Sequence, residues 1–143
     1  MTHTVAAPQQ QSHSRSTRRV TRALTLAAAA AIAVIVWTIS SPILGIDLVA
    51  GSGASAQTVG PAATIAVPVI AGALAWGLLA LLERRGRAGR IAWQIIGWAV
   101  LAVSLLGPIT TAASLTVMIP LVIMHLSVGI CLIVGLPAAG KNA

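Results

Sequence analysis

The chain has 143 residues, of which 57% are hydrophobic and only 8% are charged, with a formal net charge of +7. Soluble domains carry roughly 25% charged residues, so these proportions exclude a water-soluble fold of this length. The positive charge would suit a nucleic acid, but every Lys and Arg flanks an apolar run, as the positive-inside rule expects of a membrane protein. We therefore expect no nucleic-acid partner.

Four apolar runs follow one another along the chain, each long enough or nearly long enough to cross a bilayer. Residues 1–21 precede them and are polar and basic, which predicts a disordered cytoplasmic tail. Residues 22–137 are predicted to form one transmembrane domain, followed by a short cytoplasmic tail at residues 138–143. The predicted spans cover approximately residues 22–39, 63–82, 91–107 and 115–136.

The first connection, residues 40–62, is the longest and is punctuated by Gly and Pro. Its apolar pairs, Ile43-Leu44 and Leu48-Val49, indicate a loop that packs on the membrane surface. Ala54-Ser55-Ala56 has the form of a signal-peptidase site, but it lies roughly fifteen residues beyond the first apolar run. Cleavage sites follow the apolar centre closely, so we expect the first helix to be retained.

Nine basic residues set the expected orientation of these spans. Four precede the first span, four lie in the connection at residues 83–90, and one follows the fourth span. Placing all nine in the cytoplasm predicts an all-α, up-down bundle of four transmembrane helices, multi-pass in the plasma membrane, with both termini cytoplasmic. Anionic lipid headgroups are the partner that these charges favour. The nine residues are Arg15, Arg18, Arg19, Arg22, Arg84, Arg85, Arg87, Arg90 and Lys141.

His125 is the one titratable side chain deep in a predicted span, and intramembrane ionisable groups are functional candidates by default. It lies eleven residues from Leu136, or about 16 Å at helical rise. Ala71 and Ala102 fall at that depth on neighbouring spans, with Ser104 within one turn. An imidazole there could relay a proton or sense pH. Alternatively, a neutral ring bonds to Ser104 or to a carbonyl freed by a nearby proline and joins helices, which we favour because no carboxylate lies at that depth.

Few other residues could carry chemistry. Asp47, in the external loop, could contact a ligand but is better explained as the cap of a local turn. Three soft side chains of the fourth span, Met118, Met124 and Cys131, would suit copper together with an imidazole, but their spacing divides them between helix faces. With two acidic residues in the chain and no phosphate loop or Ser-His-Asp arrangement, we expect no enzyme activity, metal or cofactor.

The first two spans carry small residues, within residues 27–31 and at Gly72, Ala73 and Gly77. Small residues let helix backbones approach closely in lipid, where packing drives association. We therefore interpret the protein as a non-enzymatic packing or accessory component that associates with itself or with a larger membrane complex. The alternative is a small oligomeric transporter or channel component in which His125 lies on a polar path.

Five stretches beyond the basic tail carry a family resemblance. They are GIDL (45–48), QTVGPAA (57–63), AWGLLALLER (75–84), SLLGPI (104–109) and MHLSVGICLIVGL (124–136). Together they resemble a family of small four-helix membrane proteins, common in actinobacteria, whose function is unknown. The resemblance implies a four-helix integral membrane fold and implies no activity. His125, Asp47 and the Gly107-Pro108 turn fall inside these stretches.

Overall fold

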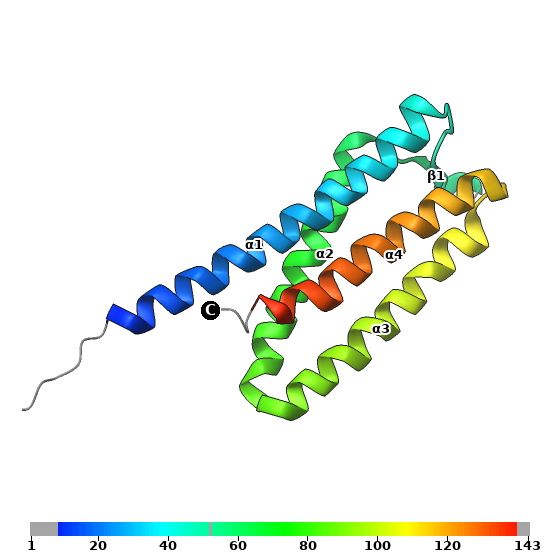
Figure 1. Cartoon of the computed structure of the whole chain (residues 1–143). Coiled ribbons are helices and arrows are strands. Elements are labelled where there is room, and N and C mark those ends of the chain that lie inside the picture. The colour runs from blue at the N-terminus through cyan, green and yellow to red at the C-terminus, as the bar shows by residue number, and fades with distance from the viewer. Residues whose placement is uncertain (1–8, 52, 140–143) are drawn as a thin grey trace, which may run out of the picture.

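The computed structural model describes residues 9–51 and 53–139, with side chains from Ser16 onward except that of Ser55. Within this part of the chain, three continuous helical stretches are long and apolar enough to cross a membrane, and the second of them contains two antiparallel helices (Figure 1). This confirms the general prediction of an all-helical fold suited to a membrane. The long helices are α1 (Gln9–Thr38), α2 (Pro61–Leu82), α3 (Gly86–Thr111) and α4 (Leu115–Ala138).

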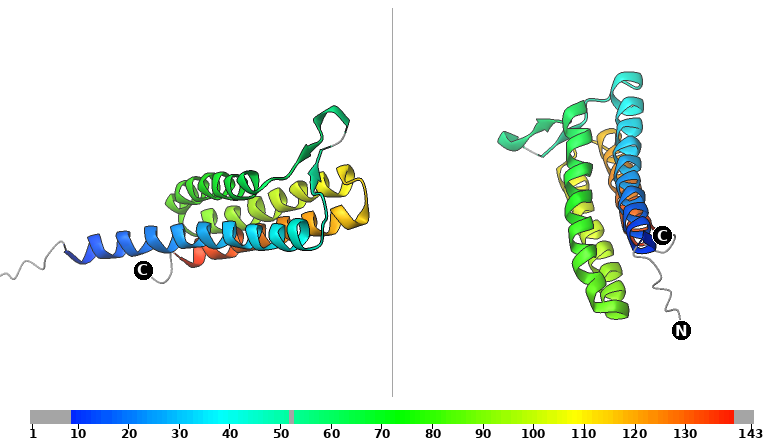
Figure 2. Two further views of the ribbon diagram at one scale, coloured as in Figure 1. Left: turned by 90° about the horizontal axis from the view of Figure 1, so that it is seen from above. Right: turned by 90° about the vertical axis from the view of Figure 1, so that its left-hand side faces the viewer.

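The helices are not packed evenly around one axis. Helix α1 lies along both α2 and α4, and α4 also packs against α3. Helices α2 and α3 diverge from the turn that joins them, so α4 lies between α1 and α3 (Figures 1 and 2). One end of the molecule, here called the arginine end, carries the α2–α3 turn; the opposite end, the hairpin end, carries a short β-hairpin.

The α2–α3 turn is shorter than the predicted connection at residues 83–90. It consists of the 3₁₀ turn η3 (Glu83–Arg85), and α3 begins at Gly86, whose φ of 60° strains any residue with a side chain. Arg87 and Arg90 therefore lie in the first turns of α3. The predicted connection was wider than the observed turn because polar residues can end a membrane span without ending the helix. Arg is a good helix former, so the helix can include these residues.

Helix α1 also begins earlier than predicted. It starts at Gln9, so residues 9–21 are helical in the structure, where the sequence predicted a disordered tail. No Gly or Pro interrupts the chain between Gln9 and Thr38, and Gln, Arg and Ala all favour helix. Residues 1–8 of the predicted tail lie outside the described residues, as do residues 140–143 of the C-terminal tail.

The third and fourth helices run through their prolines. Helix α3 contains the predicted span at residues 91–107 and continues past Pro108 to Thr111. Helix α4 likewise contains Pro120 and Pro137. Only residues 112–114 separate the two helices, and a link this short makes them antiparallel neighbours.

The connection between α1 and α2 is folded onto the hairpin end. After the π-helical turn η1 (Ile39–Ile43), strand β1 (Val49–Ala50) pairs antiparallel with β2 (Gln57–Thr58), and the 3₁₀ turn η2 (Gly53–Ser55) lies between them. The side chain of Leu48 is only 1% exposed, and the indole of Trp37 donates a hydrogen bond of 2.7 Å to the carbonyl of Val59. Leu48 thus enters the helix bundle, whereas Ile43 and Leu44, the other apolar pair of this loop, are exposed.

Two apolar clusters hold the helices together. The cluster near the arginine end is formed by Ala29, Leu79, Leu82, Trp93, Leu132 and Leu136, and the cluster near the hairpin end by Ala33, Leu48, Leu121 and Met124. Gly72 permits the close approach of α1 to α2, since a Cβ there would lie 2.9 Å from Cγ of Leu26. The rest of the helix surface exposes large apolar side chains, as a bilayer requires.

Candidate functional site

An apolar groove runs between α2 and α3, with α4 as its floor. Its volume is about 760 Å³, and α1 contributes none of its lining. The lining runs along α2 from Ala63 to Leu78, which is about 22 Å at helical rise. The groove is open along one side. Val67, Leu74 and Val100 line it, and each of these side chains is more than 60% exposed. In a bilayer this opening would face hydrocarbon.

His125 lies on the floor of this groove. Its Nδ1 is 2.8 Å from the carbonyl oxygen of Leu121, one turn earlier on α4. A carbonyl can only accept, so Nδ1 carries the hydrogen, and in this tautomer Nε2 is an acceptor with no partner among the described residues. The carbonyl freed by Pro120 would be that of Thr116, so the predicted bond to a proline-freed carbonyl is not the one that forms.

Ser104 lines the groove beside His125, as the depth comparison between spans suggested, and Ala71 lines it too. Both polar residues also line a smaller cavity of about 290 Å³ towards the hairpin end, so they lie where the two spaces meet. The Ser104 hydroxyl donates to the carbonyl of Leu101 at 2.8 Å rather than to the imidazole. The two residues therefore share a cavity without the interhelical hydrogen bond that the sequence suggested.

Asp47 is not part of this arrangement. It is exposed, lines neither cavity and forms no hydrogen bond with any described residue, so the expected cap of a local turn is not formed there. Met118 lines neither cavity, and Cys131 is a free thiol whose sulfur is 3.9 Å from the carbonyl of Thr25. Across the described residues, no three His, Cys, Asp or Glu side chains gather closely enough to hold a metal.

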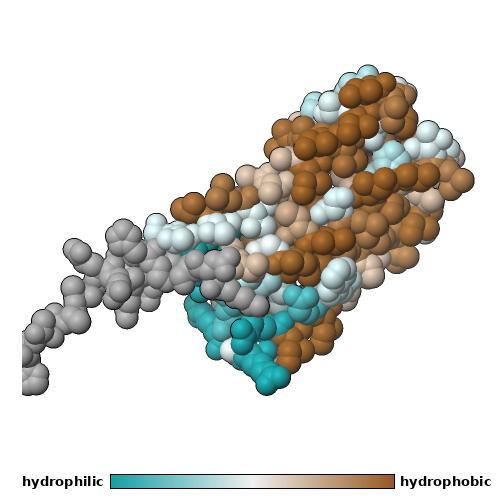
Figure 3. Space-filling view, viewed as in Figure 1, coloured by the Kyte–Doolittle hydropathy of each residue, from teal (hydrophilic) through white to brown (hydrophobic). Residues whose placement is uncertain are grey.

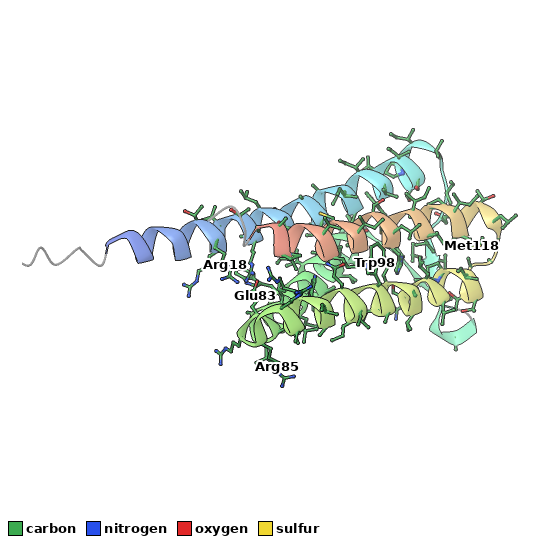
Figure 4. The ribbon with its side chains drawn as sticks, turned by 60° about the horizontal axis from the view of Figure 1, so that its bottom comes forward. Arg18, Glu83, Arg85, Trp98 and Met118 are labelled. Atoms are coloured by element: carbon green, nitrogen blue, oxygen red, sulfur yellow. The ribbon has the colours of Figure 1, made fainter. Side chains whose placement is uncertain are left out.

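A second polar cluster lies at the arginine end, where a turn residue meets α1. Arg18 and Arg22 each form an ion pair with a different carboxylate oxygen of Glu83. Figure 4 shows Arg18 beside Glu83, with Arg85 pointing away on the far side of the turn. The Arg22 side chain is only 4% exposed, and its Nε has no hydrogen-bond partner among the described residues. This cluster fixes α1 against the α2–α3 turn.

The remaining arginines form the polar cap of the molecule. Arg19, Arg84, Arg85, Arg87 and Arg90 are exposed at the arginine end, which is the hydrophilic end of the face drawn in Figure 3. The side chain of Arg15 and all of Lys141 lie outside the described residues.

The profile of a family of unknown function, DUF6069, matches residues 13–142 of this chain. The chain belongs to that family. No curated protein and no solved structure matched it. The DUF6069 match covers nearly the whole chain, including both polar clusters, and it assigns no activity to either.

Two features of this DUF6069 member were not predicted from the sequence. The ion-paired cluster was signalled by Arg18 and Arg22, four residues apart on one helix face, and by Glu83, the one acidic residue near the basic clusters. Trp93 is buried in the part of the groove nearest the arginine end, and its indole donates a 3.0 Å hydrogen bond to the carbonyl of Ile133 on α4. No sequence signal distinguished it from the other Trp residues.

Proposed function

We propose that this protein is a non-enzymatic, four-span component of the plasma membrane that works by packing against copies of itself or a larger complex. The supporting observation is that only some of the small residues on α1 and α2 are buried between helices of this chain, while others are exposed. Ala29 and Gly72 are buried between helices, but Ala27 and Ala31 of α1 point outward. On α2, Ala73, Gly77 and Ala80 are likewise exposed.

Small residues on a lipid-facing surface have a physical use. Hydrocarbon solvates a Leu as well as a helix partner does, so association in membranes depends on close backbone packing. A Cβ built at Gly77 would meet nothing within 4 Å, so this position is empty space beside the helix backbone. A partner helix could approach α2 there more closely than anywhere occupied by a large side chain.

Gly77→Leu gives the direct test, because the added side chain has room in the monomer and would obstruct only a partner. Gly107→Leu on α3 is the matched control, since its Cβ also meets nothing within 4 Å. Crosslinking in native membranes, followed by native mass spectrometry in mild detergent, should give oligomers or a co-purifying protein for the wild type and the control. Gly77→Leu should lose most of them. Monomers alone in the wild type, with nothing co-purifying, would refute the proposal.

The proposed orientation has both termini and the arginine end in the cytoplasm and the hairpin end outside. It is supported by the gathering of exposed arginines at one end, where anionic headgroups would be their partners. In a Cys131→Ala background, Asp47→Cys should react with an impermeant maleimide added to intact cells, and Ser16→Cys should not. The reverse pattern would overturn the orientation.

The transport alternative has one supporting observation, which is that His125 and Ser104 line both cavities. It is the weaker proposal because the groove towards the arginine end is lined by apolar side chains, including Leu78, Leu132 and Ile133. A proton or solute would meet no further polar path in that direction. Equal flux through liposomes containing wild type and His125→Ala would exclude a transport role for the imidazole.

A further inference from the structure

The groove between α2 and α3 has the volume of a small-molecule site. Its volume of about 760 Å³ falls in the range of roughly 300–1,000 Å³ that is typical of such sites.

Residues of the α1–α2 connection line the groove at its hairpin end. Ala50, Gln57 and Thr58 of the hairpin, with Val59, contribute to its lining, and the Trp37 hydrogen bond to Val59 anchors this segment to α1. The route left into the groove is sideways from the lipid, between α2 and α3, where its wall residues are exposed.

Below the hairpin, the polar side chains that line the groove have no hydrogen left to donate, whereas Gln57 and Thr58 of the hairpin carry donor groups. Thr64 donates to Gly60, Trp93 to Ile133 and Ser104 to Leu101, in each case to a backbone carbonyl. The imidazole also uses its one hydrogen on a carbonyl. Below the hairpin, the groups left without a partner among the described residues are Nε2 of His125 and the second lone pair of the Ser104 oxygen, both acceptors. Below the hairpin, an occupant is therefore recognised by a hydrogen that it donates.

We propose that this groove binds a membrane-soluble small molecule bearing a hydroxyl group, whose apolar body lies along α2 and α3 and whose hydroxyl donates to Nε2 of His125. A ketone, ether or bare hydrocarbon of the same shape gains the apolar contact without the hydrogen bond. This site lies apart from the exposed faces of α1 and α2 that carry the packing proposal, so either can fail alone.

The test uses a matched pair of probes on the full-length protein in liposomes. One is a 4-alkylphenol carrying a diazirine on its alkyl chain; the other is its methyl ether, which cannot donate. After photolysis, labelled positions are found by mass spectrometry, and competition with unlabelled probe gives relative affinity. The phenol should label residues lining the groove and bind roughly three- to tenfold more tightly than the ether, as expected for one net hydrogen bond.

Variants then separate recognition from simple filling. His125→Phe should reduce phenol binding to the level of the ether and leave the ether unchanged, whereas His125→Gln, which keeps an acceptor, should retain a preference for the phenol. Val100→Trp fills the groove and should prevent specific labelling by both probes. Val103→Trp, at a similarly exposed position of α3 outside the groove, should prevent neither.

Equal affinity of the wild type for the phenol and the ether would overturn the proposal. This comparison uses the wild-type protein alone, so it does not depend on the folding of any variant. So would labelling spread evenly over the lipid-facing helices and unaffected by Val100→Trp, because the groove would then hold only bulk lipid. Crosslinks from the groove lining to a second protein chain would equally overturn it, since a protein would then be the occupant.

Discussion

The ion-paired cluster at the arginine end makes the sharpest prediction about stability. Glu83→Gln keeps the shape of the side chain but leaves Arg18 and Arg22 without a counter-charge. Removing one partner of a fully buried ion pair costs roughly 3–5 kcal/mol. Glu83 is 24% exposed, so water compensates part of this loss, and we expect a cost of about 2 kcal/mol. Most of it should come from Arg22, whose side chain is 4% exposed, and little from Arg18, at 38%.

The assay is equilibrium unfolding in mixed micelles with increasing SDS mole fraction, followed by Trp fluorescence and circular dichroism. Arg18→Met should cost no more than about 1 kcal/mol, as exposed ion pairs usually do. Combining Arg22→Met with Glu83→Gln should be less destabilising than the sum of the two single changes, because the double variant buries no unpaired charge. Arg85→Gln, at an exposed site of the same turn, should stay within about 0.5 kcal/mol of wild type.

Two results would refute this reasoning. One is a Glu83→Gln variant as stable as Arg85→Gln, because the carboxylate would then contribute nothing. The other is an equal cost for Arg18→Met and for Arg22→Met, because burial of the guanidinium would then not decide the energy.

Three further predictions use the same unfolding assay or limited proteolysis. Leu48→Ala should lower the free energy of unfolding by about 2–4 kcal/mol and make the α1–α2 connection easier to cleave, because it empties a fully buried site. Unchanged cleavage would show that Leu48 does not hold this connection against the helices. Gly72→Leu should cost about 1–3 kcal/mol, because even its Cβ would lie 2.9 Å from a side-chain carbon of α1, and stability equal to Gly77→Leu would contradict that contact. Trp93→Phe should cost about 1 kcal/mol for its buried hydrogen bond, whereas Trp98→Phe, at an exposed indole, should cost almost nothing.

The sequence predicted which segments are apolar better than it predicted where helices begin and end. The apolar runs all fall within helices, because hydrophobic length is a direct requirement of the bilayer. The boundaries near residues 21 and 90 were misplaced because Arg and Gln are polar and also helix-forming. Pro108 marks the end of the third apolar run but not the end of its helix, since a helix in lipid can continue through a proline when neighbouring groups satisfy the freed carbonyl.

The candidate site was predicted only in part for a related reason. Helical rise placed His125, Ala71, Ala102 and Ser104 at similar depths, and the structure brings all of them except Ala102 to one groove. Depth along a helix says nothing about rotation around it, so the bond partners of the imidazole and the hydroxyl could not be chosen from sequence. The divergence of α2 and α3, which creates the groove, depends on packing of all the helices and has no local sequence signal.

The pairing of Arg22 with Glu83 also bears on how the protein is made. The two residues are 61 positions apart, so α1 leaves the ribosome long before its counter-charge exists. We therefore expect Arg22 to stay hydrated or paired with headgroups until α2 has been synthesised, and α1 to reach its final depth only then. On this expectation, α1 completes its insertion only after Glu83 has been synthesised at the end of α2, so the order of synthesis is part of the folding mechanism.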